Sequence, residues 1–155
     1  MNSSEVISEL FLFKDVLQLT KQFTLGKTER LKSRKQIDLL FSNGRKLAVP
    51  QFQIYFSVIH SMPASSSPLQ FGVAVSSKKF KKAVDRNRIK RLVREGWRLQ
   101  KNELKEKLIA NNLQLTIFFI YNDKILPEFL AVKKSVSNVV KKLLTITDEN
   151  NSSNS

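Results

Sequence analysis

The sequence has no cysteine, and His60 is its only histidine. The lack of cysteine excludes a disulfide framework and any zinc site with cysteine ligands, and it is compatible with a reducing cytoplasm. His60 follows a strand-like segment and precedes a loop-like one, a position typical of an exposed histidine without a chemical role. We therefore expect a cytoplasmic protein that uses neither thiol nor imidazole chemistry.

Catalytic and metal-binding motifs are lacking as well. The sequence contains no HExxH, Walker loop or GxGxxG motif. Its Asp and Glu residues are scattered, so a two-metal carboxylate site of the kind found in protein nucleases has no obvious ligands. We therefore expect no catalytic residue and no metal ligand in the chain, which argues against a metal-dependent nuclease.

Long uninterrupted hydrophobic runs are absent from the chain. Residues 6–19 are partly apolar, but Glu9, Lys14 and Asp15 interrupt them, so they form neither a signal-peptide core nor a membrane span. An Asn/Ser-rich composition near the end of the chain is typical of a disordered tail. The sequence thus predicts no membrane partner. It also predicts three parts, namely a flexible extension over 1–22, one folded domain over 23–147 and a disordered tail over 148–155.

What the chain has in excess is positive charge. It carries 27 Lys and Arg against 13 Asp and Glu, a net charge of +14. Self-repulsion at this charge is costly unless the partner is a polyanion, either nucleic acid or an anionic membrane surface. Nucleic acid is favoured because many of the cations fall on a predicted helix and no lipidation motif is present.

Residues 83–108 are predicted to form one long helix whose two sides differ in chemistry. At 100° per residue, Ile89, Val93 and Trp97 share one side, with Leu92 beside them, and Leu104 and Leu108 extend the stripe. A solvated helix normally mixes Glu with Lys, whereas the opposite side here is nearly all of one sign. That side carries Asn87, Arg91, Arg94 and Arg98, with Arg86 and Arg88 at its edges.

The first half of the domain reads as a helix followed by three strands. Ser33 and Gln36 have the spacing of a capping box, and Gly44 supplies a stop, so a helix is predicted over 34–43. In 51–59 apolar and polar residues alternate, which predicts a half-buried strand with Tyr55 on its polar side. Further strands are predicted over 45–49 and 69–76, with a flexible loop over 61–68.

The second half adds a strand and a helix after the basic helix. Residues 113–121 are apolar on both sides, which predicts a central strand, and Pro127 is expected at the first position of the last helix. The order is α-β-β-β-α-β-α, which predicts an α+β sandwich with one sheet and helices packed against it. The core face of the last helix is predicted to hold Phe129, Val132, Val136, Val139, Val140 and Leu143.

Residues 71–95, FGVAVSSKKFKKAVDRNRIKRLVRE, closely resemble the signature of the bacterial ribonuclease P protein component. That family pairs a glycine-containing strand with an Arg-Asn-Arg helix, and residues 30–44 resemble its first helix. The resemblance implies a mixed sheet with a left-handed βαβ crossover, against the general right-handed rule. It also implies a catalytic RNA subunit that removes the 5′ leader of precursor tRNA, with Mg²⁺ held through that RNA rather than by a protein motif.

The resemblance further implies two binding surfaces. The cleft between the first helix and the sheet is expected to hold the single-stranded leader through Ile37, Phe41, Tyr55 and Lys78, because unpaired bases stack on aromatic rings beside cations. Ile37 stands where the family often has an aromatic residue, and Ser77 stands where it usually has a lysine. Contacts to the RNA subunit are expected from Arg86, Asn87, Arg88, Lys90, Arg91, Arg94 and Arg98.

Two other functions share some of these features. A ribosomal or other structural RNA-binding protein has the same charge and the same lack of catalytic groups. A DNA-binding regulator would use residues 83–108 as a recognition helix, but it needs a second helix just before them, where the sequence predicts a strand. Co-purification with a short catalytic RNA or with ribosomal subunits separates the first alternative.

Overall fold

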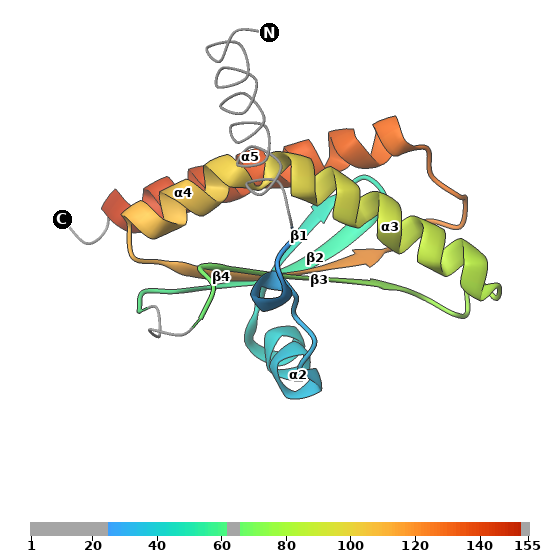
Figure 1. The fold of residues 1–155 in the computed structure, drawn as a ribbon, viewed down its shortest axis with the longest axis horizontal. Coiled ribbons are helices and arrows are strands. Elements are labelled where there is room, and N and C mark those ends of the chain that lie inside the picture. Colours follow the sequence, from blue (N-terminus) through green and yellow to red (C-terminus); the bar gives the residue numbers. More distant parts are fainter. Residues whose placement is uncertain (1–24, 62–65, 153–155) are drawn as a thin grey trace, which may run out of the picture.

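A computed structural model describes residues 25–61 and 66–152. Figure 1 shows one sheet with a layer of long helices on one face and the short helix α2 on the other. The elements are η1 (Lys27–Glu29), α2 (Arg34–Asn43), β1 (Arg45–Val49), β2 (Phe52–Ile59), β3 (Leu69–Val75), α3 (Ala83–Gln100), α4 (Asn102–Ala110), β4 (Gln114–Tyr121) and α5 (Phe129–Ser152).

The sheet is mixed, as the sequence predicts. Its strand order is β1-β2-β4-β3, with β3 parallel to β4 and the other neighbours antiparallel. Helices α3 and α4 form the connection between the two parallel strands. The predicted α+β architecture is therefore confirmed, and so is the element order apart from the division of the basic helix into α3 and α4. The left hand of this crossover stays an expectation of the family resemblance.

The main core lies between the sheet and the long helices. The side chains of Ile89, Val93 and Trp97 on α3 are completely buried, and the Trp97 ring stacks on Phe71 of β3 with centroids 5.1 Å apart. Fully burying a side chain of the size of Val or Ile contributes about 1.5–3 kcal/mol. The predicted apolar stripe thus anchors α3 on the sheet and turns the opposite side of the helix outward.

The basic helix is interrupted, which the sequence did not predict. One helix ends at Gln100 and the next begins at Asn102, with Lys101 between them. The Lys101 side chain is buried, and its ammonium group pairs with the carboxylate of Glu29. A contact 72 residues away in sequence therefore fixes the junction between α3 and α4. The predicted continuation of the apolar stripe is confirmed, because Leu104 and Leu108 are buried.

Helix α2 has the predicted bounds and the predicted stop at Gly44, but its N-terminus forms differently. Ser33 makes no side-chain capping hydrogen bond, so the predicted capping box is wrong. At the other end, the N–H of Gly44 donates to the carbonyl of Leu40 at 2.8 Å. A Cβ atom at Gly44 would lie 2.3 Å from that carbonyl oxygen, so glycine is required by close approach and not by a left-handed backbone.

The last helix also differs from the prediction at both ends. Its first residue is Phe129, and the carbonyl of Glu128 accepts the N–H of Val132, so Pro127 precedes the helix instead of opening it. The sequence predicts a disordered tail from Asp148, whereas α5 continues through Ser152. The reason is tertiary contact, since Thr147 is buried and Asp148 pairs with Lys107 of α4. The predicted extension over 1–22 lies outside the described residues.

Candidate nucleic-acid interface

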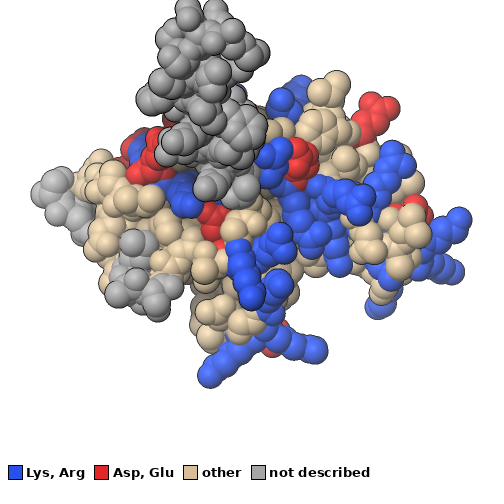
Figure 2. All heavy atoms as spheres, viewed as in Figure 1, with Lys and Arg blue, Asp and Glu red and all other residues tan. Residues whose placement is uncertain are grey.

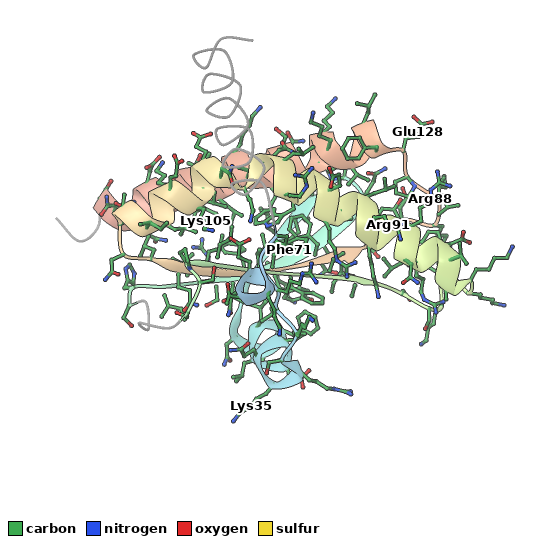
Figure 3. All side chains as sticks on the ribbon, viewed as in Figure 1. Lys35, Phe71, Arg88, Arg91, Lys105 and Glu128 are labelled. Atoms are coloured by element: carbon green, nitrogen blue, oxygen red, sulfur yellow. The ribbon has the colours of Figure 1, made fainter. Side chains whose placement is uncertain are left out.

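The outward side of α3 carries most of the predicted RNA-subunit contacts. Asn87, Arg88, Arg91 and Arg94 are exposed, and Lys90 is partly buried. In Figure 2, Lys and Arg side chains gather over α3. Figure 3 shows Arg88 and Arg91 on this helix, while Lys105 lies on α4 toward the other end of the helical layer. The buried apolar stripe holds these guanidinium groups on one solvent-facing surface.

Arg86 has a different place from the one predicted. It lies three residues before Ile89, so it follows the buried side of the helix and not the edge of the basic side. Its guanidinium Nη1 donates to the carbonyls of Phe80 and Lys81, at 2.8 and 2.7 Å. These bonds tie the loop after β3 to the start of α3, which gives Arg86 a structural role in the described chain.

Arg98 is paired within its own helix. Its Nη2 lies 2.5 Å from a carboxylate oxygen of Glu95, and its Nε donates to the other oxygen at 3.0 Å. The hydrogen bonds from Arg98 hold the pKa of Glu95 below its ordinary value, and the carboxylate raises the pKa of Arg98. Both groups stay charged, so the positive charge of this turn is offset locally.

On the other face of the sheet, three of the four predicted leader residues come together. Ile37 and Tyr55 pack against a small cluster that contains Phe118 of β4. The ring of Phe41 lies 4.8 Å from that of Tyr55 and 5.2 Å from that of Phe118, measured between centroids. Phe41 is 37% exposed, so its ring packs on neighbours and still presents surface to solvent. The result is a partly open aromatic surface beside α2.

Phe118 reaches this surface because of Gly72 on the neighbouring strand. The two residues are directly opposed in the parallel pair of β3 and β4. A Cβ atom at position 72 would lie 2.5 Å from the Phe118 ring, closer than any real contact. The glycine of the family-like strand therefore makes room for an aromatic ring that the sequence reasoning did not assign.

A second unassigned residue is Lys46 on β1. Its ammonium group lies 5.6 Å from the centre of the Tyr55 ring, within the range of a cation–π contact. The two residues are directly opposed across the β1–β2 pair. This pair could have been predicted from the sequence, because a two-residue turn at Pro50 and Gln51 places Lys46 opposite Tyr55. The aromatic surface thus has a cation at its edge, as single-strand binding requires.

Lys78, the fourth predicted leader residue, lies on the exposed loop after β3 and not in the aromatic cluster. Its backbone N–H donates to the hydroxyl of Ser76 at 3.2 Å. The neighbouring Lys79 instead donates to the carbonyl of Asn122, at 2.7 Å, and so connects this loop to the end of β4. Lys78 and Ser77 are both exposed, as are Lys81 and Lys82 further along the same loop.

His60 is exposed after β2, as expected. Within residues 25–61 and 66–152, no three His, Asp or Glu side chains are grouped so that they could hold a metal ion. None of the helices in the same ranges is both long enough and apolar enough to cross a membrane.

The cationic side of α3 and the aromatic surface beside α2 are together the features of an RNA-binding protein. The family model described as Ribonuclease P matches residues 25–145. The ribonuclease P protein component of Porphyromonas gingivalis is 35% identical over 114 residues, which cover 74% of this chain and 82% of that protein. That of Chlorobium phaeobacteroides is 30% identical over 125 residues, covering 76% and 86%.

A solved structure agrees with these matches. The RNase P protein of Thermotoga maritima superposes with a TM-score of 0.56 and 26% identity, covering 74% of this chain and 96% of that one. The chain belongs to the ribonuclease P protein family, the protein subunits of a ribonucleoprotein endoribonuclease. This membership confirms the resemblance predicted from residues 71–95.

Proposed function

We propose that the chain binds the RNA subunit of ribonuclease P and the 5′ leader of precursor tRNA, and thereby assists removal of the leader. One observation carries the proposal: the cationic side of α3 and the aromatic surface beside α2 belong to helices on opposite faces of the same sheet (Figure 1). Two surfaces on opposite faces suit two different RNA segments. The family match over 25–145 covers the elements of both.

The RNA subunit is proposed to bind the outward side of α3. Arg88, Arg91 and Arg94 are exposed there, and guanidinium groups bind phosphates with fixed bidentate geometry. Asn87 and Lys90 extend the same contact. Arg86 and Arg98 are proposed to support it indirectly, because their guanidinium groups bond the preceding loop and Glu95.

The leader is proposed to bind on the aromatic surface beside α2. Tyr55 and Phe41 offer ring faces for unpaired bases, with Ile37 in aliphatic contact in place of a ring. Lys46 supplies a cation beside Tyr55, and Lys78 supplies a second one from the loop after β3. Stacking of one base on an aromatic ring contributes about 1–3 kcal/mol.

Mg²⁺ is proposed to enter with the RNA subunit. The expected contribution of the protein is to lower the Mg²⁺ concentration that cleavage needs, since its net charge of +14 neutralises phosphates that otherwise repel one another. The cytoplasmic location expected from the sequence stays a prediction that fits this role.

Reconstitution tests the proposal. The full chain is mixed with the ribonuclease P RNA of the same organism, and cleavage of a precursor tRNA is followed across a Mg²⁺ titration. We expect no cleavage by the protein alone, and cleavage by the complex at lower Mg²⁺ than by the RNA alone. Specific cleavage by RNA-free protein, or co-purification with ribosomal subunits and not with the catalytic RNA, would overturn the proposal.

A further inference from the structure

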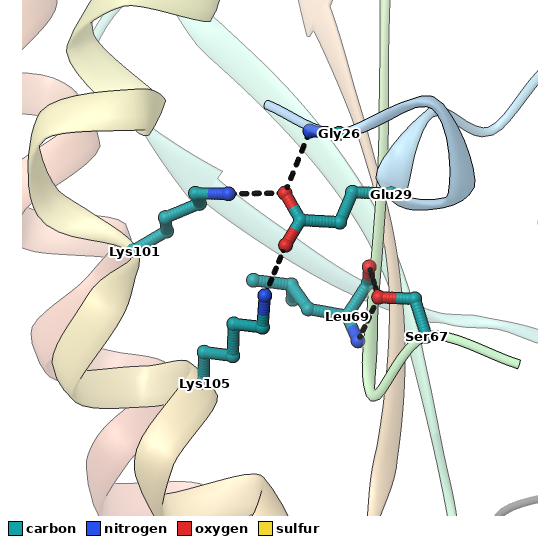
Figure 4. Close-up of polar contacts among 6 residues, drawn as sticks. All are labelled: Gly26, Glu29, Ser67, Leu69, Lys101 and Lys105. Carbon is teal, nitrogen blue, oxygen red and sulfur yellow. Dashed lines mark hydrogen bonds and ion pairs between the residues drawn. The ribbon is translucent and has the colours of Figure 1, made fainter. Parts of the chain in front are cut away.

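Arg88, Arg91, Arg94 and Arg98 form a basic stripe on the outward side of α3, and this stripe does not end with Arg98. Lys101 and Lys105 follow Arg94 and Arg98 at steps of three and four residues, which keeps them on one side of the helical layer. Here the stripe meets another part of the chain. Glu29 of η1 receives both lysines, pairing with Lys101 through one carboxylate oxygen and with Lys105 through the other (Figure 4).

The Glu29 carboxylate is deeply buried in this contact. Its side chain is 5% exposed, and the N–H of Gly26 donates to Oε2 at 3.3 Å. Burial by itself raises the pKa of Glu29, but the hydrogen bonds and charges of Lys101 and Lys105 outweigh it and hold the pKa below its ordinary value. The carboxylate is therefore charged at neutral pH. Two lysines and one carboxylate leave one positive charge at this end of the stripe.

From Glu29 the chain runs around the exposed edge of the sheet. β3 is an edge strand, and Arg30 forms a parallel bridge with its Phe71. The N–H of Leu31 donates to the carbonyl of Phe71 at 2.8 Å. Leu31 is then buried beside Leu40 on the α2 face. This segment, residues 27–33, thus passes from the helical layer to α2 and covers the edge of the sheet, as edge strands generally require.

The outer surface of the edge segment is cationic. Lys27, Arg30 and Lys32 are exposed on it, and Arg34 and Lys35 continue the exposed charge at the start of α2. Its one acidic residue is Glu29, which is turned inward and paired. In Figure 2, Lys and Arg spheres lie over α3 and also over the region between α3 and α2.

We propose that Lys27 and Arg30 bind the phosphodiester backbone of the same RNA subunit that contacts α3, so that its footprint extends around the β3 edge. Glu29 is a positioning residue in this arrangement: it fixes the edge segment against Lys101 and Lys105, which places Lys27 and Arg30 next to the stripe. The inference rests on the proposed function. It adds a contact that neither the Arg-Asn-Arg helix nor the aromatic surface supplies.

Direct binding measurements test the contact. Lys27→Ala and Arg30→Ala are combined in one variant of the full chain, and its affinity for the RNA subunit is titrated against salt. Loss of two phosphate contacts lowers the slope of log K against log salt by about 1.4 to 1.8 and weakens binding about tenfold at 0.15 M salt. Both side chains are exposed, so the unfolding midpoint is expected to stay unchanged.

A matched variant removes the same charge elsewhere. Lys134→Ala with Lys142→Ala takes two exposed lysines from α5, and we expect it to leave the slope within about 0.3 of the wild type. Equal slopes for the edge variant and the wild type would overturn the inference. So would equal losses in the edge and α5 variants, because the effect would then reflect net charge alone. A wild-type chain that fails to bind the RNA subunit would instead refute the proposed function.

The role of Glu29 is tested by a thermodynamic cycle. Glu29→Gln removes the charge that holds Lys101 and Lys105, and the edge variant is compared with and without this substitution. If Glu29 positions the edge cations, their removal costs at least threefold less affinity in the Glu29→Gln background. Additive losses would show that Glu29 has no positioning role. If the Glu29→Gln variant unfolds, Lys105→Met gives the milder disruption, since Lys105 is partly exposed.

Discussion

On the α3 side of the sheet the aromatic rings are enclosed, whereas on the α2 side they remain partly open. Trp97 is completely buried between α3 and β3, while Phe41 on α2 is 37% exposed. Within the described residues, α3, α4 and α5 cover one face, and α2 is a single helix of 10 residues on the other. The enclosed face gives α3 a fixed position from which to display charge. The open face leaves aromatic surface for a ligand.

Removing one aromatic ring from each face should change the free energy of unfolding by very different amounts. Trp97→Ala removes a ring that contacts Phe71 and Phe119, and should cost about 3–5 kcal/mol of unfolding free energy. Phe41→Ala removes a partly exposed ring and should cost about 1–2 kcal/mol. Urea denaturation of the two variants measures both. Equal losses would mean that the α2 face is as much a core as the α3 face.

A smaller effect comes from two buried glycines, one on each side. Gly72→Ala should destabilise by about 1–3 kcal/mol, because the new Cβ meets the Phe118 ring at 2.5 Å. Gly96→Ala in α3 should instead stabilise by up to about 1 kcal/mol, since the nearest atom, on Val136, lies 3.5 Å away and alanine favours a helix. Thermal melts of both variants check the opposite signs.

The Gly72→Ala variant should also affect RNA binding, and only on the α2 face. A displaced Phe118 ring disturbs the aromatic surface, so affinity for leader-containing tRNA should fall while affinity for the RNA subunit is kept. Loss of both affinities to the same degree would show that the two faces are not independent.

The sequence predicted α2 and β2 well because local periodicity carries them. The alternation from Phe52 to Val58 and the helical spacing of Ile37, Leu40 and Phe41 need no distant partner. The interruption of the basic helix at Lys101 was missed because its cause, the contact with Glu29, lies 72 residues away in sequence. Phe118 was missed for another reason: β4 is apolar on both faces, so periodicity could not tell which residues meet α2.

Substitutions on the charged side of α3 should weaken RNA binding without lowering the stability of the fold. Arg88→Ala combined with Arg91→Ala should weaken binding to the RNA subunit and lower the log–log salt slope by about 1.4 to 1.8. Both residues are exposed and lie off the apolar stripe, so folding should be unchanged. Titration of the affinity against salt checks the binding prediction, and a melting curve checks that folding is unchanged. An unchanged slope would remove this side of α3 from the interface.

The smallest expected effect isolates one ring of the open face. Tyr55 packs against Phe41, has Lys46 over its ring and accepts a hydrogen bond at its hydroxyl from Gln53 Nε2 at 3.3 Å. If its ring is the stacking platform for the leader, Tyr55→Ala should weaken binding of precursor tRNA to the reconstituted enzyme about fivefold or more. Mature tRNA has no leader, so its binding should hardly change.

Tyr55→Phe is the matched control for that variant. It keeps the ring and loses only the hydroxyl and its contact to Gln53, so leader binding should stay within about twofold of the wild type if stacking dominates. Equilibrium binding of both tRNA forms to both variants gives four affinities. Equal losses for precursor and mature tRNA in Tyr55→Ala would make Tyr55 a structural residue. A large loss in Tyr55→Phe would move recognition from the ring face to the hydroxyl.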